Sequence, residues 1–98
     1  MEKEKYLESI KNVKVPLVVL RETNLENKVI FIGFVPGLTT KDIIASNKED
    51  CLVKLKKVAK ELVTTLIKNM QHMPYFPTNK EIIEDFENVD TIKYINLV

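Results

Sequence analysis

Few residues in this 98-residue sequence have the types and spacing that chemistry needs. The single histidine, His72, and the single cysteine, Cys51, are far apart in the chain, and no third group suggests a nucleophilic triad. The two glycines, Gly33 and Gly37, do not form a phosphate-binding loop. We therefore expect no catalytic residue, no cofactor and no metal site, and we interpret the chain as a non-enzyme.

Three carboxylates come closest to a metal or acid–base site, because Asp42, Glu49 and Asp50 lie near one another in the sequence. Asn47 is a good N-cap residue, and acids just after it suit the positive end of a helix dipole. Carboxylates alone bind metal weakly, and no fourth ligand is apparent. A small-molecule or enzymatic role around Asp42, Glu49 and Tyr75 therefore ranks third among our hypotheses.

Lysines on one helical face are the residues best suited to meet phosphates. They are Lys54, Lys57, Lys60 and Lys68. Residues 48–73 hold six lysines against three acids, whereas residues 74–98 hold two lysines against five acids. The formal net charge of +1 and the single arginine, Arg21, argue against nucleic acid. We keep a small RNA-binding domain as the alternative, and the uneven charge could also guide self-association or a partner.

A long amphipathic helix must position these lysines. Apolar residues recur every three or four positions from Leu52 to Met73, and no glycine or proline interrupts this run before Pro74. We predict a helix over residues 47–73, with Asn47 as its cap and Pro74 as its stop signal. Its apolar stripe requires a sheet to pack against.

Two apolar runs, residues 13–23 and 28–35, are typical of strands joined by the polar turn 24–27. Pro16 cannot donate to a strand ladder, so it favours an edge position or a strand start. Gly33 indicates a bulge or a close backbone approach.

The other predicted elements are shorter. They are a helix over residues 2–11, a third strand over residues 42–46, a helix over residues 80–86 capped by Thr78 or Asn79, and a closing strand over residues 91–98. Together the elements predict a single α+β domain over residues 1–98, with residues 1–12 as an N-terminal helical extension. The predicted order of the main elements along the chain is β-β-β-α-β. The strands form a small antiparallel sheet that packs on one long helix.

Both long strands are apolar at successive positions instead of alternating. Strands of that kind are buried on both faces, and one helix covers only one face of a small sheet. We therefore expect a homodimer or a higher homo-oligomer, or another partner, to cover the second face. The expected interface residues are Val18, Leu20, Ile30, Ile32 and Phe34.

No apolar run approaches the length that spans a membrane. The charged start, residues 1–5, has no apolar core behind it such as a signal peptide carries. We expect a cytoplasmic protein that makes no membrane contact.

Several short stretches resemble the HicB-like antitoxin family. Residues 29–34 followed by residues 35–37 are similar to that family's strand with its Pro-Gly turn. Residues 47–52 resemble its capped, acid-bearing helix start, and residues 73–77 resemble its proline-containing exit from the helix. Residues 92–98 resemble its last strand.

This resemblance spans residues 13–98 and implies a partial RNase H-like fold without catalytic residues. It also implies self-association and capture of a small protein toxin that cleaves mRNA. Leu38 stands where the family has a cysteine, and the acid before the turn and the glycine before the helix cap are missing. Nothing follows Val98, where full antitoxins often carry a DNA-binding segment, so we do not expect autoregulation through DNA. We therefore predict a self-associating, non-enzymatic interaction module that binds a toxin or an RNA-related partner.

Overall fold

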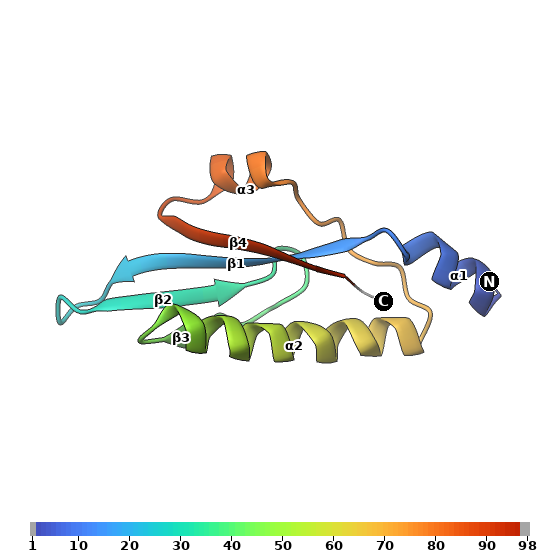
Figure 1. Ribbon diagram of the computed structural model, residues 1–98, viewed down its shortest axis with the longest axis horizontal. Coiled ribbons are helices and arrows are strands. Elements are labelled where there is room, and N and C mark those ends of the chain that lie inside the picture. The colour runs from blue at the N-terminus through green and yellow to red at the C-terminus, as the bar shows by residue number, and fades with distance from the viewer. Residues whose placement is uncertain (1, 97–98) are drawn as a thin grey trace.

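The computed structural model describes residues 2–96 as an α+β fold with a four-stranded antiparallel sheet and three helices (Figure 1). The elements are α1 (Lys3–Ile10), β1 (Lys14–Thr23), β2 (Val29–Phe34), β3 (Ile43–Ala45), α2 (Lys48–Lys68), α3 (Asn79–Asp85) and β4 (Val89–Asn96). The prediction of a small α+β fold with an antiparallel sheet and one long helix is confirmed. Of the predicted closing strand, Leu97 and Val98 lie outside the described residues.

The strands lie in the order β3-β2-β1-β4, so β1 is central and β3 and β4 form the edges. Pro16 is the third residue of β1 and pairs only with β4, because pairing with β2 begins at Val18. At Pro16 the side of β1 that faces β2 is therefore unpaired, which agrees with the edge position among the two predicted alternatives. The register with β4 shifts between Val19 and Leu20, and this shift marks a bulge in that ladder.

Gly33 allows another element to approach the backbone closely and does not form a bulge. It pairs in regular register with Val19 of β1 and Ile43 of β3. A Cβ built on Gly33 would lie 2.8 Å from Cys51 Sγ and 3.1 Å from Leu55 Cδ2. Glycine therefore allows α2 to lie directly against the sheet.

The start of α2 agrees with the sequence. The Asp50 backbone N–H donates to Asn47 Oδ1 at 2.8 Å, which satisfies one of the free donors of the first turn. Asn47 is in extended conformation, as an N-cap residue should be. The predicted cap is therefore confirmed.

The end of α2 differs from the prediction. The helix stops at Lys68, well before Pro74, because the chain turns at Met70 with a φ of 51°. The Gln71 N–H donates to the Leu66 carbonyl at 2.9 Å and the Met70 N–H donates to the Ile67 carbonyl at 3.0 Å. These two bonds are those of a Schellman motif, which ends a helix without any proline.

Helices cover both faces of the sheet (Figure 1). On one face α2 packs on β1 and β2 around a fully or nearly fully buried cluster. Its residues are Val15, Leu17, Val35, Leu55, Ala59 and Val63. On the opposite face lies α3, whose Ile82 is fully buried. The Phe86 ring that follows α3 packs on Phe34 of β2 with ring centroids 4.8 Å apart.

The prediction that no other part of the chain covers the second face is therefore wrong at Val18. Val18 is 0% exposed, and it pairs with Phe34 on one side and Ile92 on the other. The predicted short helix over residues 80–86 exists as α3 (Asn79–Asp85), and it lies over this face of the sheet. Only the part of the second face away from α3 stays open.

The N-terminal helix α1 lies beyond the end of α2, and the molecule is elongated, with extents of 52 × 24 × 19 Å. Tyr6 and Ile10 are its buried residues. The Tyr6 hydroxyl donates to the Gln71 carbonyl at 2.7 Å, within the turn that ends α2. This bond fixes α1 to the C-terminal end of α2.

Candidate functional site

The side chains considered for chemistry lie in separate surroundings. Among residues 2–96, no group of three or more His, Cys, Asp and Glu side chains is arranged to hold a metal ion. Cys51 is fully buried against the sheet, and burial raises the pKa of its thiol. A raised pKa disfavours the thiolate that a nucleophile needs. Cys51 therefore fills space between α2 and the sheet.

Asp42, Glu49 and Tyr75 belong to different surroundings. Asp42 lines a groove that contains neither of the other two residues. Tyr75 instead donates its hydroxyl to Glu81 Oε1 at 2.5 Å, and this bond lowers the pKa of Glu81 and raises that of Tyr75. Glu81 also closes the capping box of α3 with Thr78. The Tyr75–Glu81 pair therefore stabilises the start of α3.

An apolar row crosses the open part of the second face. Leu20 of β1 pairs with Ile32 of β2, and Ile32 pairs with Ile44 of β3. Because directly paired residues of antiparallel strands point to the same side, the three side chains lie in one line across the sheet. Ile44 is 62% exposed, and Leu20 and Ile32 are half-buried. We call Leu20, Ile32 and Ile44 the open row.

The predicted interface residues divide into two groups. Leu20, Ile30 and Ile32 are half-buried and lie on the open part of the second face. Val18 is fully buried, and Phe34 is half-buried against Phe86. Sequence reasoning missed Ile44, which is the most exposed member of the open row.

A groove of about 400 Å³ runs between the open row and the segment after β2. Its lining residues are Leu20, Ile32, Phe34, Val35, Pro36, Gly37, Thr39, Asp42 and Phe86. The Val35 N–H donates to Thr39 Oγ1 at 3.0 Å, and this bond holds the turn that forms one wall. Among the described residues that line the groove, Asp42 is the one that is charged, so the groove is suited to apolar contact.

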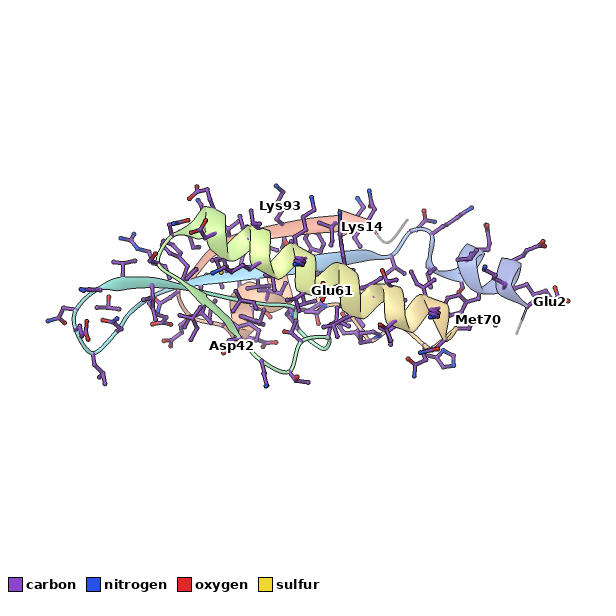
Figure 2. The ribbon with its side chains drawn as sticks, turned by 90° about the horizontal axis from the view of Figure 1, so that it is seen from below. Glu2, Lys14, Asp42, Glu61, Met70 and Lys93 are labelled. Atoms are coloured by element: carbon purple, nitrogen blue, oxygen red, sulfur yellow. The ribbon has the colours of Figure 1, made fainter. Side chains whose placement is uncertain are left out.

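The four predicted lysines all lie exposed on the side of α2 that faces away from the sheet. They are Lys54, Lys57, Lys60 and Lys68. Figure 2 views the molecule from this side and labels Glu61, an acid on the same helix. Within residues 2–96 none of the four lysines forms an ion pair. Val53, also on this side of α2, is 70% exposed.

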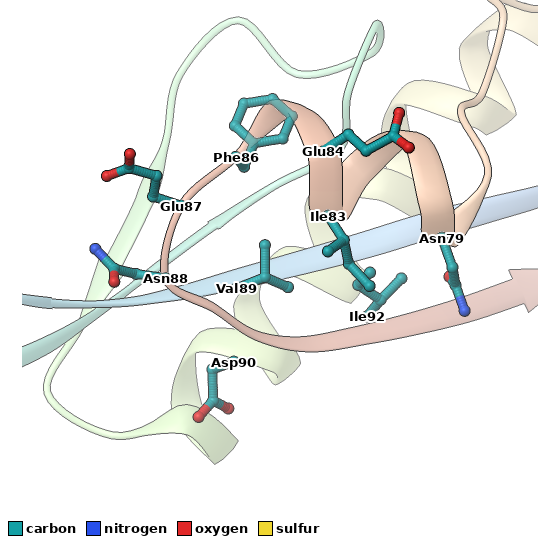
Figure 3. Close-up of a pocket in the computed structure, with 9 residues that line it drawn as sticks. All are labelled: Asn79, Ile83, Glu84, Phe86, Glu87, Asn88, Val89, Asp90 and Ile92. Carbon is teal, nitrogen blue, oxygen red and sulfur yellow. The ribbon is translucent and has the colours of Figure 1, made fainter.

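A second groove, of about 800 Å³, lies between α3 and β4 (Figure 3). The side chains of Ile83, Val89 and Ile92 gather along it, and Glu84 and Glu87 stand at its rim. Ile83, a large apolar residue of α3, is 63% exposed. Sequence analysis did not single out this groove, and the acid-rich composition of residues 74–98 was its only signal.

Comparison of the chain with protein-family models, with curated proteins and with solved structures found no match. Among the described residues, every helix is too short or too polar to span a bilayer. The surfaces described above are therefore the features of the molecule that bear on its function.

Proposed function

We propose that this protein is a self-associating interaction module in which the open rows of two copies pack on each other. The observation that carries the proposal is the line of Leu20, Ile32 and Ile44 across three neighbouring strands. An exposed apolar line of this kind on a small domain is typical of a protein interaction site. The role needs no catalytic residue.

A second copy of the chain is the occupant that fits the open row. The row is apolar, and the groove beside it carries one charge, so a surface of the same composition complements it. In a twofold contact the same patch serves on both subunits. A 98-residue chain also gains stability from an added interface, because small domains bury a modest share of their surface.

The resemblance to HicB-like antitoxins adds a partner to this proposal. The order of three strands, a long helix and a last strand motivates this partner, because the resemblance rests on that order. The corresponding role is to hold a small mRNA-cleaving toxin in an inactive complex. A gene for a small ribonuclease beside the gene for this chain would support that role, and the lack of such a neighbour would argue against it.

Sedimentation velocity of wild-type protein and of Ile44→Asp tests the self-association. Ile44 is 62% exposed, so its replacement should leave the fold intact, as thermal unfolding can verify. A twofold interface contains each residue twice, so a loss of about 1.4 kcal/mol per copy weakens the dimer about a hundredfold. Leu25→Asp is the matched control, because Leu25 is a fully exposed apolar residue in the turn between β1 and β2. A wild-type protein that stays monomeric at micromolar concentration would contradict the proposal.

RNA binding is the second candidate function, and the exposed lysines of α2 favour it. A protein that neutralises several phosphates loses affinity steeply as salt rises. Titration of single-stranded RNA at low and high salt therefore tests this function, with Lys57→Glu/Lys60→Glu as the variant expected to lose binding. The absence of any affinity at low salt would exclude it.

A further inference from the structure

Two surfaces on opposite sides of the molecule carry opposite charge. Residues 51–60 of α2 hold four lysines and no acid, whereas residues 81–90 hold five acids and no lysine or arginine. In the fold, α2 covers one face of the sheet and α3 lies on the other (Figure 1). The charge asymmetry of the sequence therefore becomes an asymmetry between two outer surfaces.

Each of these surfaces also has an exposed apolar side chain among its charges. On α2, Val53 is 70% exposed, and Lys57 and Lys60 follow it at helical spacings of four and seven residues, on the same side. On the other surface, Ile83 is 63% exposed in the α3–β4 groove beside Glu84 and Glu87 (Figure 3). We call these the basic surface and the acidic groove.

The charges of both surfaces are available for a contact between molecules. Within residues 2–96, no ion pair involves any of the four contact residues, Lys57, Lys60, Glu84 and Glu87. In the described part of the chain, one salt bridge involves residues 81–90, and it joins Asp90 to Lys48 at 3.6 Å, at the start of α2. It leaves the exposed parts of both surfaces unneutralised.

We propose that the acidic groove of one copy of this chain binds the basic surface of α2 on a second copy. Val53 of one copy lies along the groove floor near Ile83 of the other. Lys57 and Lys60 then meet Glu84 and Glu87 around this apolar centre, which is the usual arrangement of an interface with a polar rim. The chain itself supplies a complementary surface of opposite charge with an exposed apolar centre.

This contact differs in symmetry from the one between open rows. It joins two different patches, so it is heterologous and each copy keeps one free patch for a further copy. It therefore extends association beyond a dimer. It does not depend on the open row, and its rim charges make it weaken with salt, whereas an apolar contact does not weaken in this way.

Charge exchange tests the contact. Glu84→Lys/Glu87→Lys places lysines at the contact positions of both surfaces, and Lys57→Glu/Lys60→Glu places acids at the contact positions of both. Each variant alone should associate through this contact about tenfold or more weakly than wild type. An equimolar mixture should regain association, because each variant offers the sign that the other lacks. Lys3→Glu/Lys5→Glu, on exposed positions of α1, is the control with the same change of net charge as the lysine variant.

Sedimentation velocity at about 50 mM and about 500 mM salt provides the readout, because this range shortens the screening length several-fold. We expect wild-type assemblies to grow at low salt and to shrink at high salt, and the mixture to behave as wild type does. Wild type that shows no salt-dependent growth, or a mixture that fails to associate, would overturn the contact. Loss of RNA binding by the lysine variant with unchanged self-association would overturn it as well. A high-salt monomer with low-salt growth would instead contradict only the open-row dimer.

Discussion

Replacing Gly33 by alanine should destabilise the contact between α2 and the sheet. The added Cβ would lie 2.8 Å from Cys51 Sγ and 3.1 Å from Leu55 Cδ2, and both neighbours are fully buried. Overpacking of a buried site costs about 1–3 kcal/mol. Removing a glycine from a strand interior returns roughly 0.5–1 kcal/mol. We therefore expect a net loss of about 1–2 kcal/mol in the free energy of unfolding.

A second substitution shows whether the clash with Cys51 is the cause. Cys51→Ala removes the sulfur and costs about 1 kcal/mol in buried contact by itself. In Gly33→Ala/Cys51→Ala the new methyl group takes the space of the sulfur, so the double variant should be at least about 1 kcal/mol more stable than the sum of the two losses predicts.

Urea unfolding measures this coupling through the midpoint at constant slope. The thermal midpoint should move by about 4–8 °C per kcal/mol. Val63→Ala is the control partner for Gly33→Ala, because Val63 is buried on the same helix about 18 Å along its axis from Cys51 and should be additive. If the Gly33 and Cys51 losses add to within about 0.5 kcal/mol, the reasoning from the close approach is refuted.

Three further predictions concern the helix ends. Met70→Gly should stabilise the protein by up to about 1 kcal/mol, because a residue with a φ of 51° favours glycine, and a lower urea midpoint would contradict this. Tyr6→Phe should lose about 1 kcal/mol, because the Gln71 carbonyl loses its donor, and Tyr75→Phe at an exposed site should lose less in the same assay. The Tyr75 hydroxyl and the α3 cap lower the pKa of Glu81. The stability that this carboxylate adds is therefore present above about pH 4.5 and lost as pH falls through the depressed pKa. Thermal unfolding against pH should show a smaller decline in Glu81→Gln than in wild type.

The two ends of α2 show which local features a sequence encodes plainly. Asn47 followed by acids and a regular apolar stripe identifies the helix start, because the cap depends on residues three positions apart. The end depends on Met70 in a left-handed conformation that non-glycine residues adopt seldom. Pro74 was the visible stop signal, yet the Schellman bonds end the helix earlier. A helix end formed by backbone bonds around an ordinary residue leaves little trace in the sequence.

The second face of the sheet shows what only the fold decides. The apolar succession correctly indicated burial on both faces for β1, where Val18 and Val19 are both 0% exposed, but not for β2, whose second-face residues are only half-buried. The sequence could not say that a helix more than sixty positions after Val18 would lie over the second face, although residues 80–86 were predicted to be helical. Because α3 reaches only part of the face, the apolar surface left for another molecule is narrower than the strands alone implied. The open row of Leu20, Ile32 and Ile44 is that surface, so self-association should respond to Ile44, whereas changes at Val18 should act on folding.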